Sequence, residues 1–283
     1  MFIMWRIVDW EVQIVMQKLK ERLRKLAEED QSLPFSIYCS IEDQLLLNVP
    51  ILKPLLICVL DGKKELQSDT TSVCNSGDFI FLANTPKIDM RNISLGEEYF
   101  ALLIEFDYQD FSIFEYQAGQ SQDYFNGQVD DALMITLSQF IDWAPSVPQT
   151  MWQHRRKEIL QLLYHSGYKQ VRHIVEPPSL THRVEQFINA NKQNDLGLEN
   201  VASSLAMSES TLRRKLSQEN TNFQSIKDRV KLGYGLHLLQ STATSIGIIA
   251  EQCGYQSQSR FTDKFKSLFG LTPSELRKTK IKN

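Results

Sequence analysis

A near-repeat in the last third of the chain constrains its fold more than any other feature of the sequence. The same apolar spacing, i, i+3, i+4, i+7, occurs twice, 48 residues apart. Its members are Leu198, Val201, Ala202 and Leu205 in the first copy and Ile246, Ile249, Ala250 and Cys253 in the second. Each set predicts one apolar face of a two-turn helix, and the small alanine in each leaves room for another helix to approach closely.

A tight turn and a second helix are predicted after each copy. The turns cover residues 206–208 and 254–257, and Gly254 allows a chain to leave a helix through the left-handed region. Ser208 and Ser257 can cap the following helices by accepting free backbone N–H groups. The residues these helices should bury are Leu212, Leu216, Phe261 and Phe265. A helix, a tight turn and a capped helix form the helix-turn-helix signature, so the repeat predicts two such units.

The side chains left exposed on each second helix suit contacts with DNA. Such a helix enters the major groove, where Arg suits guanine, Gln suits adenine and Ser suits either. The predicted base-reading residues are Glu209, Ser210, Arg213, Arg214 and Ser217 in the first unit and Gln258, Ser259, Arg260, Asp263 and Lys264 in the second. The predicted phosphate contacts are Ser208, Lys215, Lys231, Ser257, Lys266, Lys278 and Lys280.

One helix over residues 223–240 is predicted to connect the two units. Its apolar positions are Ile226, Val230, Leu232, Leu236, Leu238 and Leu239. At about 1.5 Å per residue it would span roughly 27 Å. Units held that far apart could enter successive major grooves, roughly 34 Å apart, if the DNA bends somewhat.

Charge is divided unevenly along the chain. From Ser179 onward there are 15 Lys and Arg against 9 Asp and Glu, a net charge of +6, whereas residues 1–178 hold 16 against 25, a net charge of −9. This asymmetry fits a nucleic-acid-binding module joined to a region that does not bind nucleic acid. Chance clustering on solvated faces would give the same numbers, so the charge supports the helix-turn-helix interpretation without carrying it.

Before residue 129 the chain shows an amphipathic helix and then segments of strand length. The helix is predicted over Trp10–Asp30. The strand-like segments are Ile41–Val49, Leu55–Leu60, Lys63–Gln67 after the Asp61-Gly62 turn, Phe79–Leu82 and Tyr99–Phe106. Several short strands with turns between them predict a small sandwich or barrel.

After residue 129 the apolar period becomes helical. Helices are predicted over Ala132–Trp143 and Met151–Tyr164, and Glu176-Pro177-Pro178 should mark a domain boundary. A chain of 283 residues is long enough for two domains. The predicted organisation is a regulatory β domain over 1–128, a helical dimerisation or linker segment over 129–178, and an all-α domain over 179–283 with units at 198–219 and 246–269.

Composition narrows the class of protein. Hydrophobic residues make up 42% and charged residues 23%, which is ordinary for a globular chain. No apolar run reaches the roughly 18 residues of a membrane span, and no signal cleavage site follows the N-terminus. The cysteines, Cys39, Cys58, Cys74 and Cys253, form no metal-binding or disulfide pattern. We therefore expect a cytoplasmic protein that does not contact a membrane.

Individual residues of the second unit add a family resemblance to this spacing. They are Ile246-Gly-Ile-Ile-Ala250, Gly254-Tyr255, Ser257-Gln-Ser259, Phe261, Phe265-Lys266, Phe269-Gly270, Pro273 and Arg277. Together they resemble the C-terminal hallmark of the AraC/XylS family of transcription regulators, and residues 198–216 are similar to that family's first helix-turn-helix. The resemblance covers about 100 residues and implies sequence-specific DNA binding, with RNA polymerase as a further partner.

Some residues depart from the family pattern. Tyr255 stands where the family usually has Phe, and Leu276 where it usually has Tyr. Gly235 replaces the usual Ala, with Gly233 nearby, and each glycine weakens a helix interior by roughly 1 kcal/mol relative to Ala. The connecting helix is therefore expected to be less rigid than in the family.

The N-terminal region also resembles part of this family. Residues 54–64 and Gly77-Asp78-Phe79 are similar to the cupin-like effector domain of one of its branches. The resemblance implies a cupin-like β-barrel followed by an all-α tandem helix-turn-helix domain. It also implies that the barrel region binds a small effector, mediates a homodimer, or both.

Two other functions compete with this interpretation. A metal-dependent cupin enzyme needs histidines on its strands, but all five lie after the strand region, at His154, His165, His173, His182 and His237. We therefore expect no metal, no cofactor and no catalytic residue. An adaptor that contacts proteins through these helices remains an alternative, because Glu209 and Asp263 are unusual beside phosphates.

Overall fold

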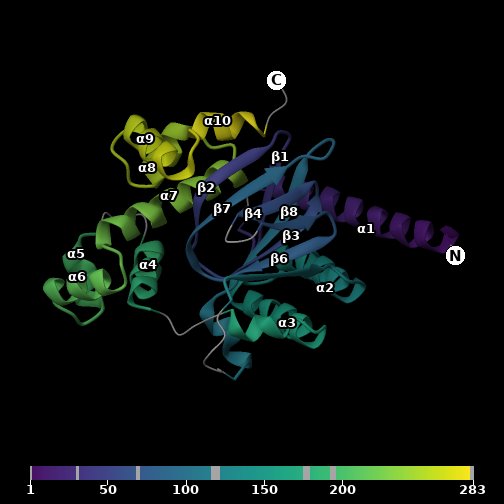
Figure 1. The fold of residues 1–283 in the computed structure, drawn as a ribbon, viewed down its shortest axis with the longest axis horizontal. Coiled ribbons are helices and arrows are strands. Elements are labelled where there is room, and N and C mark those ends of the chain that lie inside the picture. The colour runs from purple at the N-terminus through teal and green to yellow at the C-terminus, as the bar shows by residue number, and fades with distance from the viewer. Residues whose placement is uncertain are drawn as a thin grey trace.

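Two antiparallel β-sheets form the centre of the molecule, with helices on both sides of them (Figure 1). The computed structural model describes residues 2–29, 32–67, 71–115, 122–174, 179–191 and 196–280. Within these residues no helix combines the length and apolar character needed to cross a bilayer.

The sheets contain nine strands among the described residues. The first sheet has the order β1 (Ser36–Ser40), β8 (Tyr99–Glu105), β3 (Leu55–Asp61), β6 (Asp78–Leu82) and β9 (Tyr124–Gln128). The second has the order β2 (Gln44–Ile51), β7 (Thr85–Ile93), β4 (Lys63–Gln67) and β5 (Thr71–Asn75). All five predicted strand segments are confirmed, whereas β1, β5, β7 and β9 were not predicted.

The sheets are not closed into a barrel, which corrects the expected cupin-like barrel. Among the described strands, none of the first sheet pairs with a strand of the second. The Asp61-Gly62 turn does not make a hairpin either, because β4 pairs with β5 and β7 rather than with β3. The chain thus changes sheets at Gly62, and the two sheets pack against each other as in a sandwich.

The sequence of strand β3 is continuously apolar because both faces of the strand are covered. Leu56 and Cys58 pack with the helices on one side, whereas Ile57 and Val59 pack with the second sheet on the other. A strand covered on both faces needs apolar residues at every position, so it loses the alternation of a half-exposed strand.

Helices α1, α2 and α3 cover the outer face of the first sheet. Their bounds are Phe2–Glu28, Asp131–Trp143 and Trp152–His165, with short 3-10 helices η1 (Tyr108–Ile113), η2 (Ala144–Ser146), η3 (Gln149–Met151) and η4 (Lys169–His173) around them. All three predicted helices are confirmed, and α1 begins earlier than expected. The buried positions of α1 follow the predicted period at Met16, Leu19, Leu23 and Leu26.

The C-terminal region is all helical. Its helices are α4 (Leu180–Ala190), α5 (Leu198–Ser204), α6 (Glu209–Gln218), α7 (Phe223–Ser241), α8 (Ile246–Gln252), α9 (Gln258–Phe269) and α10 (Pro273–Lys278). The two helix pairs and the connecting helix agree with the sequence prediction. The boundary predicted at residues 176–178 lies outside the described residues.

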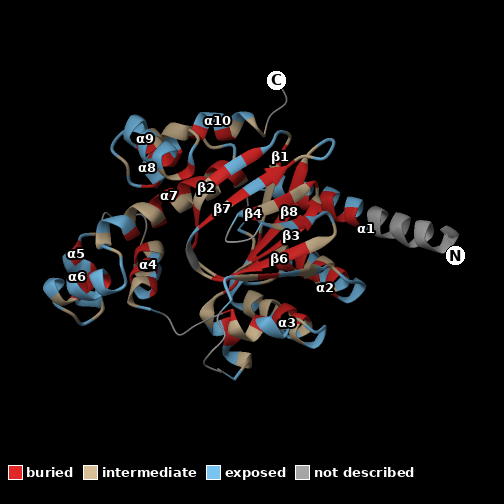
Figure 2. Cartoon of the chain, viewed as in Figure 1, coloured by how far each residue is buried: buried red, intermediate tan, exposed pale blue. Residues whose placement is uncertain are grey.

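The two helix pairs are attached to the molecule differently, as the burial colours of Figure 2 help to follow. Pair α5–α6 forms its own small core with α4 and the first half of α7, centred on Leu212 and Ile226. Pair α8–α9 instead shares one continuous core with the second half of α7 and both sheets, through Phe261, Phe265 and Leu236. The second pair is therefore packed on the β domain, and the first pair is held mainly through α7.

Candidate nucleic-acid interface and interdomain pockets

The turns within the two helix pairs have the same hydrogen bonds. In the first, the Met207 N–H donates to the Ala202 carbonyl at 2.9 Å, and in the second the Tyr255 N–H donates to the Ala250 carbonyl at 2.9 Å. Both acceptor alanines are buried, as the sequence predicted. The repeat is thus a repeat of backbone geometry, which is what a tandem helix-turn-helix requires.

Each second helix has the predicted serine cap. The Ser208 hydroxyl accepts from the Thr211 N–H at 3.2 Å, and the Ser257 hydroxyl accepts from the Arg260 N–H at 3.3 Å. A cap of this kind satisfies one of the four N–H groups that have no partner within the helix. It also fixes where the helix begins, and so which side chains stand at its N-terminal end.

All ten predicted base-reading residues are exposed. They lie on α6 (Glu209, Ser210, Arg213, Arg214, Ser217) and on α9 (Gln258, Ser259, Arg260, Asp263, Lys264). Among the phosphate candidates, Ser208, Lys215, Ser257, Lys266 and Lys278 are exposed as well.

Three of these charged residues, Glu209, Arg213 and Lys264, have partners within the chain. Arg213 lies 3.7 Å from Glu209 one turn away, and both are exposed, so water screens this pair strongly. Lys264 lies 3.0 Å from Asp228 on α7. Lys264 is therefore tied to the connecting helix, whereas Arg260 stands at the start of α9 with its side chain exposed.

Two lysines predicted to contact phosphates are less exposed than the other candidates, and their phosphate contacts stay predictions. Lys231 is 7% exposed, and its ammonium donates to the Gly254 carbonyl at 3.3 Å. Lys280 is partly buried and donates to the Gln240 carbonyl at 2.5 Å, and burial lowers its pKa. Both lysines fall where α7 packs against its neighbours, a contact that helical spacing alone does not reveal.

The two unusual glycines of α7 lie at close contacts. A Cβ at Gly235 would stand 2.8 Å from the Phe261 ring and 3.2 Å from the Cys253 sulfur, so this glycine lets α8 and α9 approach α7. A Cβ at Gly233 would stand 3.0 Å from Pro50 of β2. The glycines weaken the isolated helix, but they permit its packing against α9 and the β domain.

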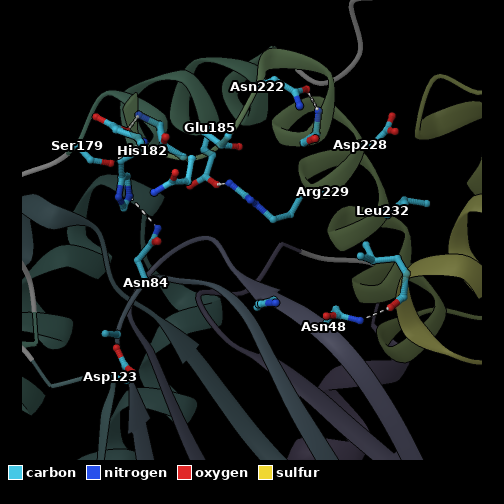
Figure 3. Close-up of a pocket in the computed structure, with 18 of the residues that line it drawn as sticks. Asn48, Asn84, Asp123, Ser179, His182, Glu185, Asn222, Asp228, Arg229 and Leu232 are labelled. Carbon is cyan, nitrogen blue, oxygen red and sulfur yellow. Dashed lines mark hydrogen bonds and ion pairs between the residues drawn. The ribbon is translucent and has the colours of Figure 1, made fainter. Parts of the chain in front are cut away.

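A cleft of about 1100 Å³ lies between the β domain, α4, the first half of α7 and the end of α9 (Figure 3). Asn84, after β6, donates to His182 Nε2 on α4 at 2.8 Å, and the Tyr108 hydroxyl lies against both ring nitrogens of His182, 3.0 Å from Nδ1 and nearer still to Nε2. Glu185, one turn further along α4, forms an ion pair with Arg229 of α7. These side chains connect α4 to both the β domain and α7 across the cleft.

His182 is kept neutral by its surroundings. It is 8% exposed, and burial, followed by the positive charge of Arg229, lowers its pKa to about 4. The neutral ring can then accept from the Asn84 amide at Nε2, with the Tyr108 hydroxyl against both ring nitrogens. The sequence predicted only that His182 is one of five histidines outside the strands. Its hydrogen-bond partners could not be predicted, because they lie 74 and 98 positions away.

A second, smaller pocket of about 210 Å³ lies between the second sheet and α7. Its walls are mainly apolar, with Leu46, Met90 and Leu236 among them. Its polar lining includes Lys64 of β4, Asn92 of β7 and Gln240 of α7, which are 3%, 1% and 1% exposed. The burial of Lys64 could have been predicted from strand alternation, because Lys64 lies two residues before the apolar Leu66 and so on the same, inward face of β4.

These polar residues form a buried chain of hydrogen bonds across the two domains. Lys64 Nζ donates to Asn92 Oδ1 at 2.6 Å, and Asn92 Nδ2 donates to Gln44 Oε1 at 3.0 Å. The same Gln44 oxygen accepts from Gln240 Nε2 at 3.1 Å, and Gln44 Nε2 donates to the Thr279 hydroxyl at 2.7 Å. We call these five residues the amide chain.

Comparison with known proteins identifies the C-terminal region. A family model described as a helix-turn-helix domain matches residues 201–279. The C-terminal domain belongs to the AraC/XylS family. The AraC/XylS domain thus contains both the α8–α9 pair and most of the α5–α6 pair, in agreement with the residue pattern that first suggested it.

Curated relatives from Escherichia coli K12 match this AraC/XylS domain. The chain is 37% identical to the porin thermoregulatory protein EnvY over 95 residues and 36% identical to the transcriptional regulator AdiY over 90 residues. These matches cover 34% and 32% of this chain and 38% and 36% of the relatives. The chain therefore matches little more than a third of the length of these relatives.

Solved structures extend the likeness beyond the AraC/XylS domain. ToxT from Vibrio cholerae aligns with a TM-score of 0.64 at 14% sequence identity, over 89% of this chain and 100% of that one. A form of ToxT with bound unsaturated fatty acid aligns with a TM-score of 0.63, over 88% and 96%. At this identity the comparison shows a shared fold, which includes the β domain as well as the helices.

Proposed function

We propose that this protein is a transcription regulator of the cytoplasm that binds specific DNA sequences through both helix pairs and responds to a small effector. The observation that carries the proposal is the repeated turn, because it leaves α6 and α9 as two capped helices with exposed Arg213 and Arg260. Such helices can enter major grooves, where arginine binds guanine bidentately. The EnvY and AdiY relatives support regulation as the activity, and nothing in this reading requires catalysis.

The pocket between the second sheet and α7 is the proposed effector site. It combines apolar walls with a buried ammonium group, Lys64, and both domains contribute to it. A molecule bound there would touch β4 and α7 together, so its binding would depend on how the domains are packed. The fatty acid in the ToxT structure supports an effector with an acidic head and an apolar chain.

A homodimer and contact with RNA polymerase belong to the same proposal. The β domain leaves apolar side chains exposed on its helices, Val15 on α1 and Ile135 on α2. Light scattering over a range of concentrations would measure the oligomeric state directly.

Mobility shift of promoter fragments, including the region upstream of the protein's own gene, tests the DNA-binding proposal. We expect sequence-specific binding whose affinity falls steeply as salt rises, because several phosphate contacts release counterions. Absence of binding to every fragment would favour the adaptor alternative and overturn the regulator.

Substitution of the two arginines tests the base-reading assignment. Arg213→Ala and Arg260→Ala should each weaken binding by about 1–3 kcal/mol and relax specificity in different halves of the footprint. Lys25→Ala is the control, because it removes one exposed charge on α1, a helix that packs on the first sheet and belongs to neither helix pair. A variant that footprints like the parent protein would show that its arginine does not read bases.

A further inference from the structure

Strand β2 contains a bulge at two consecutive residues, Leu47 and Asn48. Three steps along β2, from Leu46 to Val49, lie opposite two steps along β7. The extra residue lets Leu46 and Val49 both pack in the core of the second sheet, although an odd spacing would place them on opposite faces of a regular strand. Leu47 and Asn48 therefore do not follow the alternation of β2 and can contact another element.

The backbone of the bulge is fixed by the neighbouring strand. Asn48 has a φ of +49°, in the left-handed region that asparagine tolerates better than most residues. Its N–H donates to Oδ1 of Asp89 on β7 at 2.7 Å. Asp89 lies between the two β7 residues that pair with Leu46 and Val49, so it stands opposite the bulge. A side chain of β7 thus replaces the usual backbone acceptor at this point.

Both bulge residues contact the C-terminal end of α9. Asn48 Nδ2 donates to the Leu268 carbonyl at 3.0 Å (Figure 3). This carbonyl is among the last four of α9, which have no N–H partner within the helix. Leu47 lies against the glycine that ends the helix, since a Cβ at Gly270 would stand 3.0 Å from Leu47 Cδ1. We call Leu47 and Asn48 the β2 clasp.

The β2 clasp is anchored in the β domain on both sides. Leu46 and Val49, which flank it in sequence, are 2% and 7% exposed and also line the pocket between the second sheet and α7. The clasp therefore cannot shift without disturbing buried side chains. It gives α9 a fixed support outside the helix pair to which α9 belongs.

We propose that the β2 clasp positions α9 for DNA, with Asn48 as the positioning residue. This inference rests on the proposed DNA-binding function and adds a role for the β domain in it. Helix α6 is held differently, through a core that it shares with α4, α5 and the first half of α7. Fixing α9 before DNA arrives lowers the entropy that binding must remove, so the clasp favours binding by the second pair in particular.

Hydrogen exchange of the free full-length protein tests the clasp without DNA. Asn48→Gly removes the donor to the Leu268 carbonyl, whereas glycine adopts the left-handed backbone freely, so the bulge itself should persist. The amides of residues 266–270 should exchange about fivefold faster, because the last turn of α9 loses a hydrogen bond to β2. The amides of α6 should exchange as in the wild type.

Asn220→Gly is the matched control. Asn220 is exposed, follows α6 and has a φ of +54°, so the same substitution is made in the same backbone conformation beside the other helix pair. Exchange at residues 266–270 should not change in this variant. The unfolding temperature of both glycine variants serves as the control for overall stability.

Two variants of Asp89 separate positioning from a general loss of structure. Asp89→Ala removes the acceptor of the Asn48 N–H and should speed exchange at the end of α9, although the Asn48 side chain is intact. Asp89→Asn keeps an oxygen that can accept this bond and should restore the wild-type rate. Both variants remove the same charge, so the charge of Asp89 cannot account for a difference between them.

Footprinting on a promoter fragment then tests the consequence for DNA. Asn48→Gly should bind about fivefold more weakly, with protection lost in the half of the footprint that belongs to α9 and kept in the half that belongs to α6. Asn220→Gly should leave the α9 half unchanged. A defect of folding would instead weaken both halves together.

The outcomes separate this inference from the proposed function. Wild-type exchange at residues 266–270 in Asn48→Gly would overturn the clasp, whether or not the protein binds DNA. Faster exchange with unchanged or tighter binding, or with equal loss in both halves of the footprint, would overturn its role in positioning α9 and leave the DNA-binding function standing. Failure of the wild type to bind any promoter fragment would overturn both.

Discussion

Single residues decide the form of the two helix-turn-helix turns. Gly254 has a φ of +71° and Ala206, at the equivalent position of the first turn, has a φ of +53°. The left-handed conformation costs an L-residue about 1–2 kcal/mol, whereas glycine adopts it freely. The first turn therefore contains backbone strain that the second does not.

Exchanging these two residues should change stability in opposite directions. Gly254→Ala should lower the free energy of unfolding by about 1–2 kcal/mol, because it adds strain and brings a Cβ to 2.8 Å from Lys231 Nζ. Ala206→Gly should raise it by up to about 1 kcal/mol, since relief of strain exceeds the added freedom of the unfolded chain. Urea unfolding measures both changes, and the same sign for both would contradict this account.

At the scale of elements, α7 belongs to two cores. Its first half, with Ile226 and Val230, packs with the first helix pair, and its second half, with Leu232, Leu236 and Leu239, packs with the second pair and the sheets. Because the first pair has a small separate core, it can lose its structure without the β domain. The second pair cannot, because it shares the core of the sheets.

Truncation of one buried side chain in each pair tests this difference. Leu212→Ala should destabilise the first pair by about 2–5 kcal/mol and abolish DNA binding, while the amide protons of β3 stay protected from exchange. Phe265→Ala should cost about 3–5 kcal/mol and lower protection in both α9 and the sheets. If Leu212→Ala also exposed the amides of β3, the two cores would not be independent.

At the scale of the whole molecule, polar contacts join the domains at several places, among them the amide chain and the contacts of His182. The amide chain links β4 and β7 to α7 and to Thr279, which follows α10, and the cleft contacts link Asn84 and Tyr108 to His182 of α4. Unlike an apolar contact, such bonds are lost when a partner changes its protonation state or is taken by a ligand. They are therefore the places where conditions can alter the packing of the domains.

The His182 contact predicts a loss of stability in acid. The folded-state pKa of about 4 lies below the ordinary value of 6.5, so between these pH values the unfolded chain binds a proton that the folded chain does not. Stability should therefore fall as the pH falls from 6.5 to 4, by at most about 3 kcal/mol from this group. The raised pKa of Glu185, caused mainly by burial, acts in the opposite direction.

Comparison with His182→Gln isolates this contribution. Glutamine can still donate and accept but does not titrate, and Glu185 is present in both proteins. The wild-type unfolding temperature should fall more steeply than that of the variant between pH 6.5 and 4. Parallel curves would show that the protonation of His182 is not coupled to folding.

The sequence by itself determined the tandem helix-turn-helix units, because their apolar spacing, turns and caps involve residues only a few positions apart. The same local patterns placed β3, β6 and β8, whose apolar runs are short and bounded by turns. Only the tertiary structure decided which sheet β4 joins, why α7 contains Gly233 and Gly235, and that Lys231 is buried.

The effector pocket depended on tertiary structure most of all. Gln44 and Gln240 are 196 positions apart, and neither carries a local signal of its partner. Hydrophobic periodicity reports which face of an element is buried, but it does not report what that face meets. Local sequence therefore specifies the DNA-binding helices, whereas the site proposed to regulate them forms only when the second sheet and α7 pack together.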